Sequence, residues 1–365
     1  MEILDIKLPE YPCTCDMWDA LCAESRPIVV YGMGNGADKL IDRLQKYGVS
    51  VAEFFASDGF VRGHCFHGKR VKSFSEIRAE YDDFLILLSF ASARDEVVDM
   101  LCEIDERYDM IVPDMPVAGI EEYFDKDFYN DNYDAILCAY NSLCDVKSKD
   151  IFAAVLNYKL TGRMKYLMSA YRSMDEKYDL ISRKNIRVAV DAGAYNGDTV
   201  REMKKYFSSL ERVYAIEPDP KNFVKLNRHT QAENEIRVVA VNAAAWCESG
   251  ASEFSTSGNR NSTISATPSY EHLLSTVNLA KIDDIIDFVD YIKYDVEGSE
   301  HEALIGSDAT VRRCRPALLV SLYHRSRDVF SITNYIHYNY PDYKLYLSRK
   351  RCTPAWEIEL ICIPD

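Results

Sequence analysis

Short apolar runs alternate with amphipathic segments in two separate parts of the chain. In the first part, apolar runs at residues 28–31, 51–56 and 84–88 have the length and composition of buried strands. A glycine-rich turn at residues 32–36 follows the first run, and apolar residues at helical spacing follow that turn. Alternation of strand and helix is typical of a parallel sheet with right-handed crossovers. The sequence therefore predicts an α/β unit near the N-terminus.

The same alternation begins again at residue 186 and continues to the end of the chain. Helical patterns become rare toward the C-terminus, which indicates that the last strands pair antiparallel. We therefore predict an α/β fold whose main sheet is doubly wound, Rossmann-like, seven-stranded and closed by an antiparallel pair. The expected strands of this sheet are residues 187–192, 213–216, 236–241, 291–294, 317–323, 343–347 and 358–362.

The segment between these two parts has no strand pattern, and its apolar residues recur at helical spacing. We expect a smaller, nucleotide-fold-like Rossmann domain at residues 1–118, a helical connector at 119–184 and a larger α/β domain at 185–365. No linker rich in Pro, Gly or Ser separates the domains, so they are expected to pack against each other. A stretch rich in Ser, Thr and Asn at residues 249–269 is expected to form a hairpin and loop over the carboxyl edge of the larger sheet.

The overall charge of the chain argues against a nucleic-acid partner, although short basic stretches leave a local basic groove open. The 365 residues carry a net charge of −15, whereas a protein that holds nucleic acid through its phosphates presents a basic face. No apolar run approaches the roughly 18 residues of a membrane span, and the N-terminus has no pattern of a signal peptide. Eleven cysteines, an odd number, fit reduced thiols. We expect a cytoplasmic protein with no nucleic-acid partner and no membrane contact.

The strongest candidate for a ligand site is the junction of a strand and a helix at residues 190–199. Glycines let the backbone approach a ligand closely, and the start of the helix offers free N–H groups. In a doubly wound sheet this junction is where cofactors bind, although many α/β proteins use such glycines only to turn the chain. The candidate cofactor-binding residues here are Asp191, Gly193, Asn196, Gly197, Asp198 and Thr199.

Two further residues extend this candidate site. Glu217 ends the next strand, where an acidic side chain can accept hydrogen bonds from both ribose hydroxyls of an adenosine. Asn242 ends the third strand, where its amide could border the adenine, although small residues around it are equally consistent with simple packing. Together these positions predict an adenosine-containing cofactor.

Residues 292–300 place three carboxylates around a glycine at the end of the fourth strand. Asp295 and Glu297 are expected to project from the carboxyl edge of the sheet toward the reactive end of the cofactor. Carboxylates at such an edge orient a hydroxyl, act as a base or bind a divalent metal ion. The alternative is that Glu297 and Glu300 only stabilise the start of the following helix. We assign no residue of the chain as a metal ligand.

The N-terminal glycine turn suggests a second nucleotide site. The pattern Gly32-x-Gly34-x-x-Ala37 follows a strand and resembles a dinucleotide fingerprint, and Asp58 ends the next strand, where a ribose-binding acid would lie. The later segment at residues 63–71 is expected to be a hairpin, because no Ser or Thr follows its lysine as in a phosphate-binding loop. A bound nucleotide or nucleotide-sugar and a purely structural or oligomerising domain both fit this pattern.

Several of these segments together resemble the FkbM-type methyltransferases. The resemblance rests on residues 190–199, 215–218, 281–284, 292–300 and 315–318, and covers about residues 186–325. It implies a methyltransferase that uses S-adenosyl-L-methionine, often to methylate a hydroxyl of a sugar, glycoconjugate or natural product. The chain departs from the family where many members end strand five with an acidic residue. Here Ser321 is followed three residues later by His324, a candidate proton acceptor at neutral pH.

The expected mechanism is direct methyl transfer to a small-molecule or saccharide hydroxyl. His324 is the first candidate for the catalytic base, with Asp295 or Glu297 as the second. One alternative is an NAD(P)- or nucleotide-sugar-dependent enzyme that uses the N-terminal glycine turn. That half of the chain, however, lacks a Tyr-x-x-x-Lys pair for hydride transfer. The other alternative is a non-catalytic binding module that keeps the fold.

Overall fold

The computed structural model describes residues 6–117, 122–231, 235–255 and 274–365, and its N-terminal part is built on a five-stranded parallel sheet. The strand order is β5-β2-β1-β6-β7. The apolar runs that predicted strands near residues 28, 51 and 84 form its three central strands. The five strands are β1 (Ile28–Tyr31), β2 (Glu53–Ala56), β5 (Lys72–Ser73), β6 (Leu85–Leu88) and β7 (Met110–Ile111).

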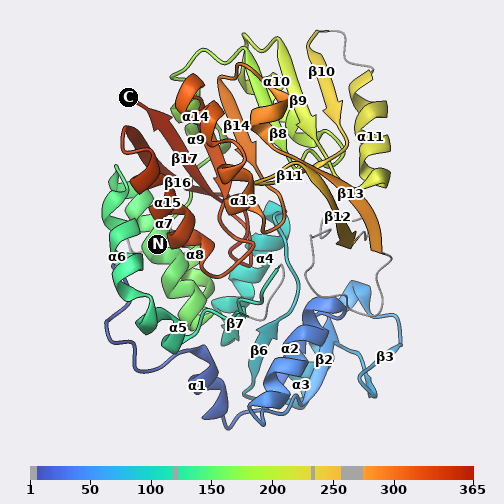
Figure 1. The fold of residues 1–365 in the computed structure, drawn as a ribbon. Coiled ribbons are helices and arrows are strands. Elements are labelled where there is room, and N and C mark those ends of the chain that lie inside the picture. The colour runs from blue at the N-terminus through green and yellow to red at the C-terminus, as the bar shows by residue number, and fades with distance from the viewer. Residues whose placement is uncertain (1–5, 118–121, 232–234, 256–273) are drawn as a thin grey trace.

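Helices cover both faces of this sheet (Figure 1). Successive strand side chains point to opposite faces, so Val30 packs in the same cluster as residues of α1 and α2, whereas Val29 packs with α3 and α4. Burial on both faces explains why these strands are continuously apolar. The helices are α1 (Met17–Cys22), α2 (Asn35–Lys46), α3 (Phe74–Glu80) and α4 (Asp95–Asp105), and a short 3₁₀ turn is at η1 (Asp58–Phe60).

A run of helices joins the two sheets and shares one apolar core with both of them. This core includes Val29 of the N-terminal sheet, Ile151 of α7 and Val190 of the C-terminal sheet. Helix α7 is buried around nearly its whole circumference because both sheets lie against it. The connector helices are α5 (Lys126–Asp131), α6 (Tyr133–Ser142), α7 (Val146–Thr161), α8 (Met164–Ser169) and α9 (Met174–Ile181).

The C-terminal part is built on a mixed sheet with the strand order β10-β9-β8-β14-β15-β17-β16. The first five strands are parallel, and β17 pairs antiparallel with both β15 and β16. The α/β class expected from the sequence is confirmed. The strands are β8 (Val188–Ala192), β9 (Arg212–Ile216), β10 (Arg237–Val241), β14 (Tyr291–Tyr294), β15 (Ala317–Ser321), β16 (Tyr343–Arg349) and β17 (Ile358–Pro364).

Helices and a small extra sheet complete this part (Figure 1). The helices are α10 (Asp198–Tyr206), α11 (Pro220–Gln231), α12 (Ile282–Ile285), α13 (Glu300–Ile305), α14 (Asp308–Cys314) and α15 (Asp328–Asn339). The small sheet has the order β11-β13-β12, in which β12 and β13 are antiparallel. Its strands are β11 (Ala244–Ala245), β12 (Gly250–Ser255) and β13 (Leu274–Ala280). The loop expected at 249–269 lies outside the described residues from 256 onward.

Two smaller features agree with the sequence. Strands β3 (Cys65–Phe66) and β4 (Lys69–Arg70) form an antiparallel hairpin, as predicted for residues 63–71. All eleven cysteines are free. Within the part of the chain that the structure describes, none of the helices has the length and apolar character that crossing a bilayer would require.

Candidate functional site

A cavity of about 290 Å³ opens at the carboxyl ends of β8, β9 and β14. The three parallel strands end at the same edge of the sheet, so the turns that follow them meet there. The end of the connector and the hairpin between β16 and β17 also line the cavity. Five of the sequence-predicted site residues for the cofactor line this cavity, namely Gly193, Asp198, Thr199, Glu217 and Asp295.

The turn between β8 and α10 requires glycine because of its packing. Gly193 has a φ of +89°, and a Cβ atom there would lie 1.8 Å from the backbone oxygen of Asp295. Its N–H donates to the backbone oxygen of Ile216, which fixes the turn against β9. Gly197, the N-cap of α10, has a φ of +85°. The glycines therefore bring three strand ends together around the cavity.

Asp191 lies beneath this turn and does not line the cavity. Its side chain is fully buried, and neither carboxylate oxygen has a hydrogen-bond partner among the described residues. The Nζ atom of Lys293 is 3.8 Å from Oδ1. Burial raises the pKa of Asp191 to about 7, against the opposing charge of Lys293. Asp191 therefore supports the site from below.

Two other residues of the predicted turn also stay outside the cavity lining. The backbone oxygen of Asn196 accepts a hydrogen bond from Nδ1 of His229, 2.8 Å away. Gly197 faces Leu226 and Thr230 of α11. Both residues shape the turn and its packing on α11. The residues of the turn that line the cavity are Gly193, Asp198 and Thr199.

Glu217 is held rigidly at the end of β9. The backbone N–H of Tyr195 donates to its Oε2 at 2.8 Å, and the N–H of Asp219 donates to its Oε1 at 2.9 Å. Burial raises the pKa of Glu217 to about 7 despite these two donors. Each oxygen keeps a further lone pair, so the carboxylate can still accept hydrogen bonds from a ligand.

Asn242 takes a different place from the predicted one. Its amide donates to the backbone oxygens of Glu217, at 2.8 Å, and Pro218, at 3.2 Å, and the residue does not line the cavity. The small residues Ala244 and Ala245 of β11 line it instead. Asn242 therefore positions the segment that carries Glu217 and does not itself face the cavity.

At the end of β14, the buried Lys293 forms an ion pair with the partly exposed Asp295 on the cavity wall. The Nζ atom of Lys293 is 2.9 Å from Oδ2 of Asp295, while Oδ1 accepts hydrogen bonds from the hydroxyls of Ser321 at 2.9 Å and Tyr323 at 3.3 Å. Burial alone would raise the pKa of Asp295, but Lys293 and His324 hold it well below its usual range. Asp295 is therefore a fixed anion and a weak base.

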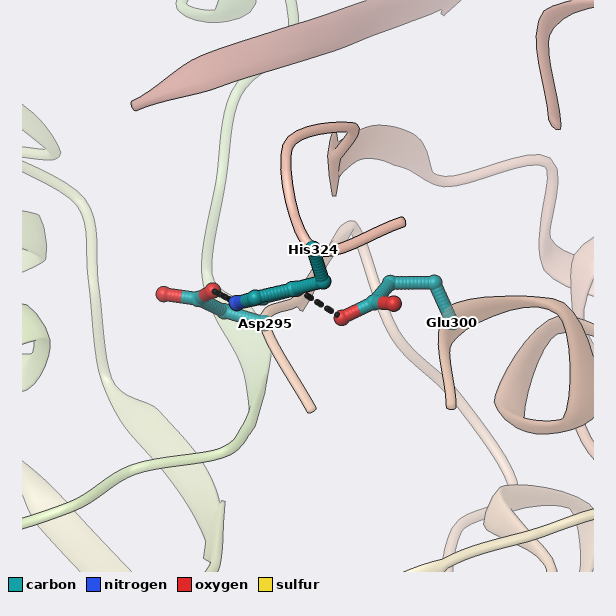
Figure 2. Close-up of side chains that lie close together, drawn as sticks. All are labelled: Asp295, Glu300 and His324. Carbon is teal, nitrogen blue, oxygen red and sulfur yellow. Dashed lines mark hydrogen bonds and ion pairs between the residues drawn. The ribbon is translucent and has the colours of Figure 1, made fainter. Parts of the chain in front are cut away.

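His324 lies behind the cavity wall, between carboxylates (Figure 2). Its side chain is fully buried, and its Nδ1–H donates to Oε1 of Glu300 at 2.8 Å. Its Nε2 is 3.7 Å from Oδ1 of Asp295 and 3.5 Å from Oε2 of Glu297. Burial alone would lower the pKa of His324, but Glu300, with Glu297 and Asp295, raises it to about 10. The structure thus corrects our first choice of base, because a charged, enclosed imidazole cannot take a proton from a ligand in the cavity.

Of the carboxylates around His324, Glu297 and Asp295 both reach the cavity, and Glu297 is not held by Lys293. The side chain of Glu297 is 24% exposed, and it lines the cavity beside Asp295. Burial raises the pKa of Glu297 to about 8, although His324 opposes the shift. The interpretation that Glu300 is structural agrees with its contacts, since its Oε1 accepts hydrogen bonds from the backbone N–H groups of Val296 and Gly298.

Backbone strain is concentrated around this cavity. Among the described residues, five that are not glycine have a positive φ, and three of these five line the cavity. These three are Tyr195 at 47°, Glu297 at 54° and Glu357 at 55°. Such conformations cost about 1–3 kcal/mol each and are found preferentially at functional sites. The strain supports a functional role for the cavity that does not depend on any motif.

Sequence reasoning missed the wall formed by the connector and the last hairpin. Arg172 and Lys177, near the start of α9, line the cavity together with Ser348, Lys350 and Glu359 of the hairpin. The Nζ atom of Lys177 is 3.0 Å from Oε2 of Glu359, which ties the two segments together. No sequence signal marks these positions. The sequence did offer a signal for Lys293, because a lysine in the middle of a buried strand requires a partner of opposite charge.

The N-terminal glycine turn is explained by packing. A Cβ atom on Gly36 would lie 2.3 Å from the backbone oxygen of Ser89, and one on Gly32 would lie 2.8 Å from Phe90. Both carboxylate oxygens of Asp58, the expected ribose-binding acid, accept hydrogen bonds from Ser75 at the start of α3. The contacts of these residues therefore give no evidence for a nucleotide site in this domain.

Comparison with known proteins identifies the domain that carries the cavity. Residues 191–344 match the family model described as Methyltransferase FkbM domain. The chain carries an FkbM methyltransferase domain. The cavity at β8, β9 and β14 belongs to this FkbM domain, whereas Arg172 and Lys177 of the connector and Glu359 of the last strand lie outside the matched range and complete its wall.

Solved structures extend the likeness to the whole chain. Methyltransferase FkbM from Methylobacillus flagellatus KT has a TM-score of 0.68 at 21% identity, covering 98% of this chain and 94% of that chain. It shares the fold, including the part that precedes the FkbM domain. Fibrillarin from Aeropyrum pernix, in complex with natively bound S-adenosyl-L-methionine, has a TM-score of 0.31 at 11% identity and covers 49% of this chain and 67% of its own. No curated protein matches the chain.

Proposed function

We propose that the chain transfers a methyl group from S-adenosyl-L-methionine to a hydroxyl of a sugar, glycoconjugate or natural product. The observation that carries this proposal is the position of the cavity. It lies within the FkbM domain at the carboxyl ends of β8, β9 and β14, where the Gly193 turn and the fixed Glu217 carboxylate face each other. A doubly wound sheet binds cofactors at this edge.

The charge of the cavity fits a cationic cofactor. Its lining holds seven acidic and four basic side chains, so acidic groups outnumber basic ones. The carboxylates are Asp198, Glu202, Glu217, Asp295, Glu297, Glu357 and Glu359, and the basic residues are Arg172, Lys177, Lys293 and Lys350. This excess of acidic groups favours a sulfonium cation over the pyrophosphate of a nicotinamide dinucleotide.

Individual residues can be assigned to parts of this cofactor. Glu217 would accept the ribose hydroxyl protons, and Ala244 and Ala245 would border the adenine. Gly193, Asp198 and Thr199 would approach the amino-acid end, with Asp191 acting from beneath the turn through Lys293. Bound S-adenosyl-L-methionine supplies an electrophilic methyl group and a neutral thioether leaving group.

The protein's own chemical task is then to align the acceptor and to remove its proton. We assign the removal of this proton to Glu297, which lines the cavity. Asp295 is held by Lys293, and His324 is enclosed by protein. The positive charge of His324 would stabilise the carboxylates of Glu297 and Asp295 next to it.

Calorimetric titration with S-adenosylhomocysteine tests the cofactor assignment. We expect the wild-type chain to bind it and Glu217→Gln to bind it about 10- to 100-fold more weakly, because hydrogen bonds to a charged group contribute about 1.5–3 kcal/mol. Asp58→Asn is the matched control in the N-terminal domain and should bind like the wild type. Binding of NADH in place of S-adenosylhomocysteine, lost in Asp58→Asn, would move the chemistry to the N-terminal turn. Binding without turnover on a broad panel of hydroxyl compounds would favour a non-catalytic module.

The same titration should depend on pH through Glu217. The folded pKa of Glu217 is raised to about 7 from 4.5, so part of its population is protonated at neutral pH and cannot accept both ribose hydrogens. Affinity for S-adenosylhomocysteine is therefore expected to rise between pH 6 and pH 8 in the wild type. In Glu217→Gln this rise should be smaller, and an identical pH profile in the two proteins would exclude Glu217 as its source.

A further inference from the structure

The turn between β16 and β17, residues 350–357, is called the hairpin tip below and lies at the carboxyl edge of the larger sheet. The cofactor is assigned to the ends of β8 and β9, with its reactive end at β14, and β15, β17 and β16 follow on the far side of β14. Because β17 runs antiparallel to both neighbours, β16 ends and β17 begins at the edge where the cavity opens. With the cofactor placed in this way, the hairpin tip borders the space left for the acceptor.

Lys350 and Glu357 lie at the two ends of the hairpin tip, and both line the cavity. The backbone N–H of Lys350 donates to the backbone oxygen of Glu357 at 3.3 Å, so the two residues face each other across the hairpin. Neither side chain makes a hydrogen bond or an ion pair within the part of the chain that the structure describes. An ammonium group and a carboxylate are therefore available to hydrogen-bond the oxygens and hydroxyls of an acceptor.

The N-terminal domain holds the outer side of the hairpin tip. Ser92, in the segment after β6, forms an antiparallel bridge with Thr353: the N–H of Ser92 donates at 2.8 Å and the N–H of Thr353 donates back at 3.0 Å. Beside this bridge, Arg351 forms ion pairs with two carboxylates of α4, Asp95 at 3.3 Å and Asp99 at 2.5 Å. The domain without evidence for a nucleotide site thus contacts the residue that directly follows a cavity-lining lysine.

The base of the hairpin is held by the connector instead. The buried Arg349 donates through Nη1 to the backbone oxygens of Leu167 at 2.5 Å and Ala170 at 3.3 Å. Its Nη2 donates to the backbone oxygen of Cys352 at 2.6 Å. The connector therefore fixes the start of the hairpin tip, and the N-terminal domain supports the part that lies beyond it.

We propose that the N-terminal domain positions the acceptor side of the cavity. Arg351 and the Ser92–Thr353 bridge hold the hairpin tip in the place where Lys350 and Glu357 contact the acceptor. Arg351 is a positioning residue in this arrangement, because it acts through its neighbours and does not line the cavity. The inference rests on the proposed function, since that function assigns this side of the cavity to the acceptor. It requires no ligand in the N-terminal domain.

Amide hydrogen exchange, followed by mass spectrometry, tests the positioning without cofactor or acceptor. Arg351→Asp places a third carboxylate beside Asp95 and Asp99, so the hairpin tip should separate from α4. We expect amides in residues 350–357, and that of Thr353 above all, to exchange at least about 10-fold faster than in the wild type. Unchanged exchange in Arg351→Asp would overturn the proposal.

Two further proteins separate the positioning from a general loss of stability. Adding Asp99→Arg to Arg351→Asp restores a pair of opposite charges and should slow the exchange again. Arg187→Ala removes a two-bond ion pair with Glu211 at the start of β8 and should leave exchange in residues 350–357 unchanged. Faster exchange of the same amides in Arg187→Ala would overturn the proposal, because the hairpin tip would then respond to any lost ion pair.

Steady-state kinetics on an acceptor from the hydroxyl panel test the role of the hairpin tip. Lys350→Met, Glu357→Gln and Arg351→Asp are each expected to raise KM for the acceptor about 10-fold while kcat stays within about threefold. The double variant with Asp99→Arg should recover most of the KM. The affinity for S-adenosylhomocysteine should remain within about twofold in all of these proteins.

The outcomes distinguish this inference from the proposed function. An unchanged acceptor KM in Lys350→Met and Glu357→Gln, or a loss of S-adenosylhomocysteine binding in them, would overturn the acceptor role of the hairpin tip and leave the proposed function intact. A wild-type chain that binds S-adenosylhomocysteine but methylates no compound would overturn both. The hydrogen-exchange result would still decide whether the N-terminal domain holds the hairpin tip.

Discussion

Replacing Glu297 with glutamine is expected to lower kcat for methyl transfer by about 10²- to 10⁴-fold, which is the usual contribution of a general base. Glutamine keeps the size and most hydrogen bonds of the side chain but cannot accept the acceptor's proton. The affinity for S-adenosylhomocysteine should remain within about twofold, because Glu297 is assigned to the acceptor and not to the cofactor. Steady-state kinetics on an acceptor identified in the hydroxyl panel, with calorimetry in parallel, measures both quantities.

A carboxylate outside the cavity serves as the control for this variant. Glu302→Gln on α13 makes the same change of charge five positions farther along the chain and does not alter the cavity lining. Its kcat should stay within a few-fold of the wild type. If Glu297→Gln retains full kcat while Asp295→Asn loses it, the proton is taken by Asp295 and our assignment is wrong.

Replacing Gly193 with alanine is expected to destabilise the fold by about 3 kcal/mol and to abolish measurable cofactor binding. The new Cβ would lie 1.8 Å from the backbone oxygen of Asp295, so the ends of β8 and β14 would have to separate. The positive φ of +89° adds strain for any side chain. Denaturant unfolding gives the loss of free energy, and calorimetry gives the loss of binding.

A variant at a second glycine separates the steric clash with Asp295 from the strain of a positive φ. Gly48 has a φ of +70°, and a Cβ atom there would have no neighbour within 4 Å among the described residues. Gly48→Ala should therefore cost only the conformational part, about 1 kcal/mol. Equal losses in Gly48→Ala and Gly193→Ala would mean that the turn relaxes and that the close approach to Asp295 is not required.

The parts of this protein that the sequence predicts well depend on local pattern. The apolar run at residues 187–192 and the glycines after it define β8 and its turn, and the next apolar run ends in Glu217 as expected. Each of these features needs only neighbours within one strand-turn-helix unit. The same holds for the hairpin at residues 63–71.

The parts that the sequence does not predict depend on contacts between distant segments. His324 was a plausible base until the structure showed Glu300 and Asp295 enclosing its ring. Arg172 and Glu359 reach the cavity only because the connector packs against the last hairpin. Asn242 turned out to hold the backbone of Glu217. Burial and long-range pairing decided each of these roles, and neither can be read from composition or spacing.

The most direct test of the central claim is a crystal structure of the chain in complex with S-adenosylhomocysteine. The account predicts that the ligand lies in the cavity at the carboxyl ends of β8, β9 and β14, with its ribose hydroxyls on Glu217 and its amino-acid end beside Gly193. The sulfur atom should point toward Glu297. A ligand bound at the N-terminal glycine turn, or one in the cavity whose ribose makes no contact with Glu217, would contradict the account.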